Sequence, residues 1–223
     1  MKKSILAAAL LSICAYTSNA QFKISQDLNG TPIETRVAGD VVGSIYLYDD
    51  FYKGHALEEN NTYYDNLDLR YDIQADRVSF KNKYGVEFAF KNPIKEFKIS
   101  RSKTDPQVVL TFRNGFPPIA EFTEKSYYQV LNDGNTVALK KLKKSIVEST
   151  PYGLAKTQKN FVTSEQYFIF LKGKMIKIKR DKKSIIEALD SHKEELSRFI
   201  GENALSFKKD EDLSKLVDYY NTL

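Results

Sequence analysis

The sequence predicts an α+β fold, in which an antiparallel, β-rich sandwich or open roll is followed by three short C-terminal helices. Between residues 21 and 180, short runs alternate apolar and polar residues, which is typical of half-buried strands. After residue 180 the apolar spacing changes to i, i+3, i+4, which is typical of amphipathic helices. We therefore divide the chain into a signal peptide at 1–20, a β-rich region at 21–180 and a helical subdomain at 181–223 that packs on the sheet.

The first 20 residues have the three regions of a secretory signal peptide. Lys2 and Lys3 form a basic start, and residues 4–16 are mostly apolar, a stretch too short to span a bilayer as a mature helix. Ser18 and Ala20 are the small residues of a cleavage site. The alternative, a buried N-terminal helix, does not account for this order. We expect an exported chain, periplasmic or secreted, without a transmembrane segment in its mature form.

The single cysteine of the chain, Cys14, lies inside this leader. A bacterial lipidation site needs a small residue immediately before the cysteine, whereas Ile13 is large, so we do not expect a lipoprotein. Without the leader the mature chain contains no cysteine, which excludes disulfides, thiolate metal sites and cysteine nucleophiles.

The strands are predicted by runs such as NLDLRYDI at 66–73, in which leucine, tyrosine and isoleucine alternate with charged residues. The strongest hairpin signal is Asp133-Gly134, between the runs YYQVLN and NTVALKKL. Connections between the runs are short, which favours a meander over helical crossovers. Residues 151–160 form the most loop-like interior stretch and are a candidate division of the sheet into two parts.

The three helices are predicted by caps and apolar stripes. Asp181 is a candidate N-cap of the first helix, and Ser191 with Glu194 fits a capping box before the second. The third begins at the acidic run 210–212, which favours the positive end of a helix dipole. The expected stripes are Ile185, Ile186 and Leu189; Leu196, Phe199 and Ile200; and Leu213, Leu216, Val217 and Tyr220, with Leu223 as an extension.

A basic run, LKGKMIKIKRDKK at 171–183, raises the question of polyanion binding. Residues 137–183 carry 13 basic and 3 acidic side chains, yet the mature chain has a net charge of only +3, from 32 basic and 29 acidic residues. Export also separates the chain from nucleic acid, which we exclude as a partner. A solvated sheet face is the simpler interpretation of the lysines, and an anion-binding face is the alternative. The candidate binding residues are Lys174, Lys177 and Lys179.

The residues that usually carry catalysis are sparse. His55 lies in an expected loop and His192 at a helix start, and neither has a neighbouring histidine at metal-ligand spacing. The carboxylates of 49–72 could bind Ca²⁺ or act as a glycosidase pair, but their spacing does not match an EF-hand. A charge-balanced outer face is the simpler interpretation. We predict no catalytic residue, no metal site and no cofactor.

Tyrosine is in surplus: the chain has 14 Tyr and no Trp. Because consecutive strand residues face opposite ways, one member of an adjacent pair such as Tyr63-Tyr64 is expected at the surface. Exposed tyrosine beside Asp and Asn suits contact with peptide or sugar, so we take Tyr63 and Tyr64 as further candidate binding residues.

Two stretches, NLDLRYDIQADRVSFK with FAFKNPIKEFKIS, and SIIEALDSHKEELSRFI with KDEDLSKLVDYYNTL, resemble a group of small exported proteins of unknown function from Bacteroides-type Gram-negative bacteria. The resemblance implies export, a β-rich body and a helical tail, and it supplies no site residue. We therefore expect a non-enzymatic binding or envelope-structural protein, whose partner is an unknown envelope or extracellular protein or polymer. The alternative is a hydrolase of such a polymer that uses carboxylates of 49–72. The sequence does not define the oligomeric state.

Overall fold

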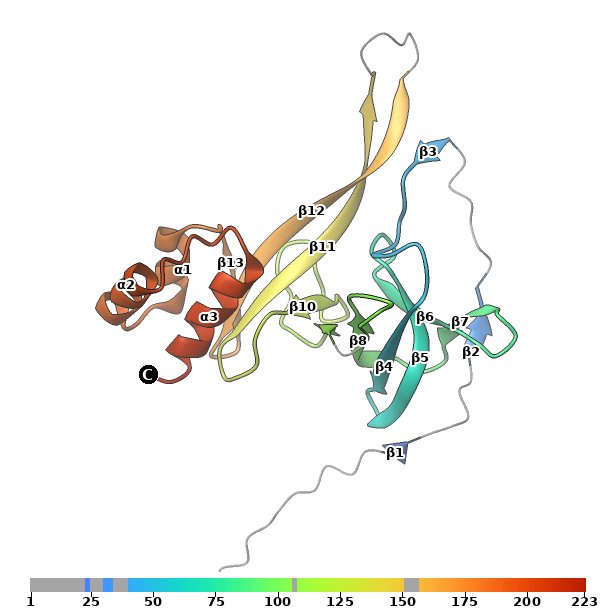
Figure 1. The fold of residues 1–223 in the computed structure, drawn as a ribbon, viewed down its shortest axis with the longest axis horizontal. Coiled ribbons are helices and arrows are strands. Elements are labelled where there is room, and N and C mark those ends of the chain that lie inside the picture. Colours follow the sequence, from blue (N-terminus) through green and yellow to red (C-terminus); the bar gives the residue numbers. More distant parts are fainter. Residues whose placement is uncertain (1–22, 25–29, 34–39, 106–107, 151–156) are drawn as a thin grey trace, which may run out of the picture.

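The structure is a computed structural model that describes residues 23–24, 30–33, 40–105, 108–150 and 157–223. The expected signal peptide at 1–20 lies outside these residues. Within them, strands dominate and three helices end the chain (Figure 1), which confirms the predicted α+β class.

The elements have the following bounds. The strands are β1 (Lys23–Ile24), β2 (Gly30–Pro32), β3 (Val41–Val42), β4 (Tyr52–Glu58), β5 (Thr62–Asp72), β6 (Arg77–Lys81), β7 (Glu87–Phe90), β8 (Ile94–Ser100), β9 (Val109–Arg113), β10 (Tyr128–Val130), β11 (Val137–Ser149), β12 (Gln158–Leu171) and β13 (Lys174–Ile178). The helices are α1 (Lys182–Leu189), α2 (Lys193–Glu202) and α3 (Asp210–Tyr220).

The strands form one open sheet, in the order β13-β12-β11-β10-β9-β8-β4-β5-β6-β7-β2. Strands β4 to β7 and β8 to β13 follow one another as two antiparallel meanders, as the short connections predict. The predicted single meander is wrong at one point, because β8 pairs with β4 instead of β7. Strand β4 has a free edge after pairing with β5, and β8 satisfies the backbone groups of that edge. Two short pairs, β1 with β5 and β3 with β12, are parallel.

The N-terminal half of the sheet packs around an aromatic core. The rings of Tyr71 and Phe97 each lie 4.9 Å from the ring of Phe112, centroid to centroid. Leu69, which the alternating pattern predicts to face inward, is buried beside them, and so is Ile99. His55, expected in a loop, lies instead in the middle of β4, because YKGHALE forms a strand between β5 and β8.

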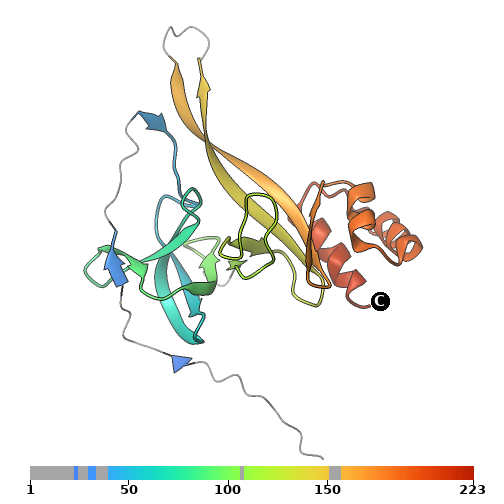
Figure 2. The ribbon, with the colours of Figure 1, turned by 180° about the vertical axis from the view of Figure 1, so that it is seen from behind.

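The C-terminal half of the sheet is covered on both faces. Ala138 and Ile169, opposite each other on β11 and β12, face the three helices. The next pair, Leu139 and Phe168, faces the opposite way and contacts the connection between β9 and β10. Seen from behind, this yellow-green connection lies beside the base of the two long strands (Figure 2). Strands β11 and β12 therefore lie between the three helices and the β9–β10 connection.

The helix starts are partly as predicted. Asp181 caps α1, since its side chain accepts a hydrogen bond from the Ser184 amide at 2.8 Å. The predicted capping box of α2 is wrong: His192 stands at the N-cap with φ 57°, and no side chain caps the helix. The Ser191 hydroxyl lies 2.8 Å from the Tyr220 hydroxyl instead. Tertiary contact with α3 has therefore replaced a local cap.

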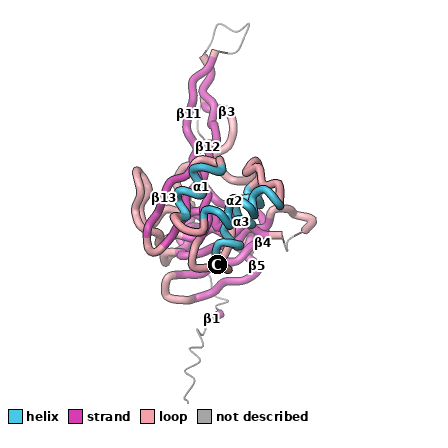
Figure 3. The backbone as a smooth tube through the Cα atoms, turned by 90° about the vertical axis from the view of Figure 1, so that its left-hand side faces the viewer, coloured by secondary structure: helices cyan, strands magenta, loops and turns pink. Residues whose placement is uncertain are grey.

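Beyond the helices, β11 and β12 continue as a two-stranded ribbon that projects from the rest of the molecule (Figure 1). Their antiparallel register is unbroken from Val137–Phe170 to Ser149–Gln158. Figure 3 shows the ribbon and β3 rising above the remainder of the chain. The expected division of the sheet at 151–160 is therefore wrong for 158–160, which belong to β12, while 151–156 lie outside the described residues.

Candidate functional site

The three candidate lysines do not share one face. Lys174 and Lys177 lie on β13 on opposite faces of the sheet, and Lys179 follows the strand. All three side chains are exposed, whereas Ile178 is buried against the helices. Three cations that point in different directions make a weak platform for an anion.

The two candidate tyrosines also separate. Tyr64 is buried: its ring lies 6.1 Å from the Phe90 ring, and its hydroxyl donates to Glu58 Oε1 at 3.1 Å. Burial, together with the Glu58 carboxylate, raises the pKa of Tyr64 to about 12. Tyr63 lies half-buried on the outer face of the sheet, with its ring stacked on His55 at 5.8 Å and 14°. Tyr64 therefore belongs to the core, and Tyr63 lies at the surface of the sheet.

Tyr63 and His55 line a shallow hollow of about 440 Å³ on the outer face of β4, β5 and β8. Glu96 and Lys98 supply both signs of charge to its wall. His55 Nδ1 lies 2.6 Å from Asp65 Oδ1, close enough for an ion pair but without the alignment of a hydrogen bond. The hollow offers an aromatic surface with balanced charge around it, which suits a small neutral or zwitterionic group better than an anion.

The carboxylates of 49–72 contact donors instead of one another. Asp50 lies 2.6 Å from Lys103 Nζ, and Asp68 lies 3.1 Å from Lys53 Nζ. Glu58, which is buried, accepts hydrogen bonds from three side chains: Asn60, Tyr64 and Asn92. Asp50 and Asp68 are therefore paired with lysines, and Glu58 is held by neutral donors.

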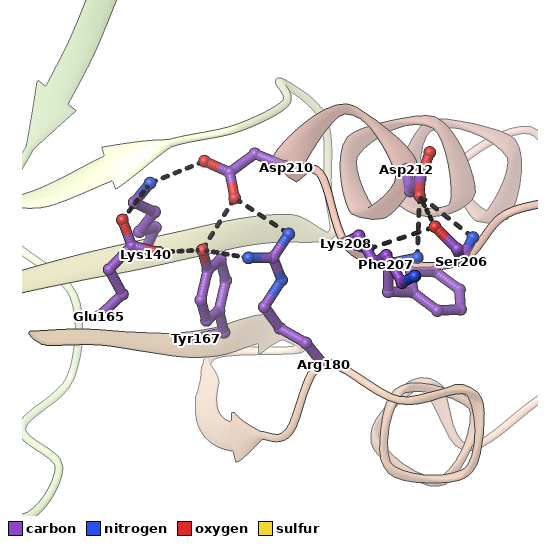
Figure 4. Close-up of polar contacts among 9 residues, drawn as sticks. All are labelled: Lys140, Glu165, Tyr167, Arg180, Ser206, Phe207, Lys208, Asp210 and Asp212. Carbon is purple, nitrogen blue, oxygen red and sulfur yellow. Dashed lines mark hydrogen bonds and ion pairs between the residues drawn. The ribbon is translucent and has the colours of Figure 1, made fainter.

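A second polar cluster, not predicted from the sequence, surrounds the start of α3 (Figure 4). The two carboxylate oxygens of Asp210 each lie 2.8 Å from a donor, one from Lys140 Nζ and the other from the Tyr167 hydroxyl. Lys140 also pairs with Glu165 at 2.9 Å, and Arg180 lies 3.8 Å from Asp210. Two cations face two carboxylates, so the cluster is neutral.

Burial and hydrogen bonding act in opposite directions on this cluster. Burial alone favours a neutral carboxyl, but hydrogen bonds from Lys140 and Tyr167 hold the pKa of Asp210 below its ordinary value. Burial also opposes a charged amine, yet the bonds to Asp210 and Glu165 raise the pKa of Lys140. Burial and the two carboxylates raise the pKa of Tyr167. The pKa shifts of Asp210 and Lys140 favour the charged form of both residues. The cluster therefore fixes α3 to β11 and β12.

The projecting ribbon is the third surface. On β11, Ile146 and Val147 are 48% and 46% exposed, and on β12 Val162 is 45% exposed. Because Ile146 and Val147 are consecutive, the ribbon has exposed aliphatic side chains on both faces. Two-stranded ribbons are at best marginally stable in water, so this one needs further contacts.

Within the described ranges, no three side chains of His, Cys, Asp or Glu lie together as metal ligands. In the same part of the chain, no helix has the length and apolar character needed to cross a membrane. No protein-family model matches the sequence, and neither a curated protein nor a solved structure matches it.

Proposed function

We propose that the chain is an exported, non-enzymatic protein that binds an envelope or extracellular partner through its projecting ribbon. One observation carries this proposal: from residue 145 to residue 149 every residue of β11 is exposed, although the strand stays paired with β12 throughout. A strand segment that gains no core contact from the described part of the chain needs a separate reason to be extended. An exposed strand edge commonly binds a partner by pairing with an extended segment of that partner.

The charge distribution of the ribbon favours a partner without a strong net charge, either a protein or a polymer. Lys143 pairs with Glu121 at 3.0 Å and Lys159 with Glu148 at 3.5 Å, so part of the basic surplus is neutralised along the ribbon. The remaining surface offers aliphatic side chains and backbone groups. These features suit another extended strand.

The alternative, a hydrolase that uses carboxylates of 49–72, has weaker support. Catalysis of glycoside hydrolysis requires two carboxyl groups that act together. Asp50, Asp65 and Asp68 each lie against a separate basic side chain, Lys103, His55 and Lys53 respectively.

A truncation tests the proposal. Replacing residues 143–164 by Asn-Gly joins Leu142 and Glu165, which are opposite each other, through a two-residue hairpin turn. We expect the truncated protein to melt close to wild type, because most of the described residues that it removes are exposed, and to lose its cross-linked partners in the cell envelope. A Tyr63→Ala variant is the control and should keep them. If the truncated protein keeps every partner while the control loses them, the hollow and not the ribbon is the binding surface.

Export is tested separately. The mass of the protein recovered from the envelope should correspond to a chain that begins at Gln21, without an acyl group on Cys14. A diacylglyceryl mass on Cys14 would contradict the expected periplasmic or secreted location and replace it with a lipoprotein anchor.

A further inference from the structure

We infer that the ribbon pairs with a second copy of this chain: the outer edges of two β11 strands join antiparallel about a twofold axis through Ile146. This inference rests on the proposed function, because it names the partner of the same ribbon. The arrangement forms a continuous four-stranded sheet from two ribbons.

The outer edge of β11 is open where the pairing is proposed. Strand β10 covers this edge only opposite Leu139 and Lys140. From 143 to 149, β11 pairs with β12 alone among the described strands. The outer edge of β12 differs, because β13 covers it from Tyr167 to Leu171 and β3 pairs with it at 159–160. Among the described strands, β11 therefore has an uninterrupted free edge from 143 to 149, whereas β3 interrupts the edge of β12 at 159–160. A free edge has unpaired backbone donors and acceptors.

Backbone geometry limits the possible registers. In a β-strand, the N–H and C=O groups of every second residue point to a given edge. Two identical edges can pair antiparallel only if opposed residues have the same parity, so a twofold axis must pass through a residue and not between residues. Every residue of 143–149 satisfies this rule, including Ile146, which would then lie opposite its own symmetry mate.

Charge selects the axis through Ile146. With the axis at Ile146, Lys144 lies opposite Glu148 of the second copy, and the pair occurs twice by symmetry. With the axis at Val147, Ile146 would face Glu148. With the axis at Lys144, the two Lys144 side chains would oppose each other. Opposite charges across strands are favourable and like charges unfavourable, so the edge is complementary to itself in one register.

The same register buries the exposed aliphatic side chains of the ribbon. Phe161 lies opposite Ile146 on β12, so one face would carry a row of four side chains: Phe161, Ile146 and their two symmetry mates. On the other face, Ser145 lies opposite Val162 within the ribbon and would lie opposite Val147 of the second copy. The small serine leaves room between the two valines. Residues that are half exposed in one chain gain apolar neighbours on both faces.

A cysteine placed on the axis tests the arrangement directly. In a Cys14→Ser background, Ile146→Cys puts two thiols on opposed residues, whose Cα atoms lie about 4.5–5.5 Å apart in an antiparallel pair, within the range of a disulfide. Mild oxidation of the full chain should give a covalent dimer. Ser149→Cys is the matched control, because its symmetry mate lies six residues away along the strand, about 20 Å. It should stay monomeric on a denaturing gel.

Charge reversal provides an independent test. Lys144→Glu and Glu148→Lys each place like charges opposite one another, and we expect each to weaken self-association by about tenfold in sedimentation experiments. An equimolar mixture should recover it, because both cross-strand pairs of a mixed dimer are again opposite in sign. Unchanged melting temperatures show that the variants are folded.

Two outcomes would overturn the inference: no disulfide from Ile146→Cys, or a mixture that associates no better than either variant alone. In that case Lys143 and Lys144 protect a solvated edge, as edge lysines often do. The proposed function would still stand if truncation of the ribbon removed envelope partners from a monomeric chain. The proposed function would fail together with the inference only if truncation of the ribbon removed no envelope partner.

Discussion

Lys141 Nζ lies 2.5 Å from Asp76 Oδ2, although the two residues are 65 positions apart in the sequence. Lys141 is only 3% exposed, and its amine also donates to the Tyr127 carbonyl at 2.9 Å. The pair connects β11 to the turn between β5 and β6, and so fixes the base of the ribbon to the N-terminal half of the sheet.

Removing one partner of this pair should be severe. We expect Asp76→Asn to lower the free energy of unfolding by about 3–5 kcal/mol, because it leaves the buried Lys141 amine without its counter-ion. Urea unfolding measures the loss. The double variant Asp76→Asn/Lys141→Met should recover most of it, since it removes the buried charge as well.

Asp68→Asn is the matched control for this prediction. Asp68 pairs with Lys53 at 3.1 Å, but both side chains are more than a third exposed. Solvent-exposed pairs contribute roughly 0–1 kcal/mol, so the control should unfold close to wild type. Equal losses in the two variants would show that burial of Lys141 is not the cause.

The Asp210 cluster predicts a loss of stability in acid. Because the folded pKa of Asp210 lies below its ordinary 3.8, and that of Glu165 below 4.5, their stabilising effect is full above these values and is lost as pH falls through the folded pKa values. We expect the melting temperature to fall steeply below about pH 4. Asp210→Asn should lower stability by about 2 kcal/mol at pH 7 and weaken this acid dependence.

Asp218→Asn is the control on the same helix. Asp218 is exposed, and its carboxylate accepts only a 3.4 Å hydrogen bond from Ser214. We expect a change within about 0.5 kcal/mol and an unaltered acid transition. If the Asp210 and Asp218 variants follow the same pH profile, the cluster does not govern acid stability.

Local patterns predicted the local structure well. Alternation placed Leu69 and Tyr71 in the core, and the Asp181 cap gave the start of α1. Adjacent residues on opposite faces explain why Tyr64 is buried and Tyr63 is not. These features depend on two to four neighbouring residues, so a short stretch of sequence is enough to predict them.

Features that depend on distant residues were missed. Asp210 meets Lys140 and Tyr167 only because α3 returns to the long strands, 70 and 43 residues back along the chain. The ribbon was missed because its outer half has no core face, so no alternation of buried and exposed residues marks it. The return of β8 to β4 likewise depends on which sheet edge is free, a property of the assembled sheet.

The basic surplus should produce only weak polyanion binding. Lys174 and Lys177 point to opposite faces, and Lys140 and Lys141 are paired with acids. We expect elution from a heparin or duplex-DNA column below about 0.15 M salt, since scattered cations act through counterion release. Lys177→Glu/Lys179→Glu should change the elution little.

The control for column binding is Lys208→Glu/Lys215→Glu, which makes the same change of charge at two exposed positions near and on α3. Both double variants should shift elution equally. Retention well above 0.15 M that disappears only in the Lys177/Lys179 variant would make this region an anion-binding face, contrary to our interpretation.

The C-terminal helix should be essential for stability, although chain ends are usually dispensable. Leu213, Leu216 and Val217 of α3 are buried against the sheet and the other helices. Tyr219 stacks on Phe199 at 4.0 Å, and the Tyr220 hydroxyl donates to the Leu189 carbonyl at 2.9 Å. The predicted extension of the stripe to Leu223 is wrong, because Leu223 is 48% exposed and lies beyond the helix.

We therefore expect Leu216→Ala to lower the free energy of unfolding by about 2–5 kcal/mol, out of a typical total of 5–15 kcal/mol, because the cavity it leaves is fully buried. Leu223→Ala, the same change at an exposed position, should cost less than about 0.5 kcal/mol. Deletion of 210–223 should give a protein that aggregates, since it uncovers Ile169, Ile185 and Leu189 together. Thermal melting with light scattering measures both effects. A deletion variant that melts within about 2 °C of wild type would show that α3 adds little to the core, and Tyr219 and Tyr220 would then be the first residues to test for contact with a partner.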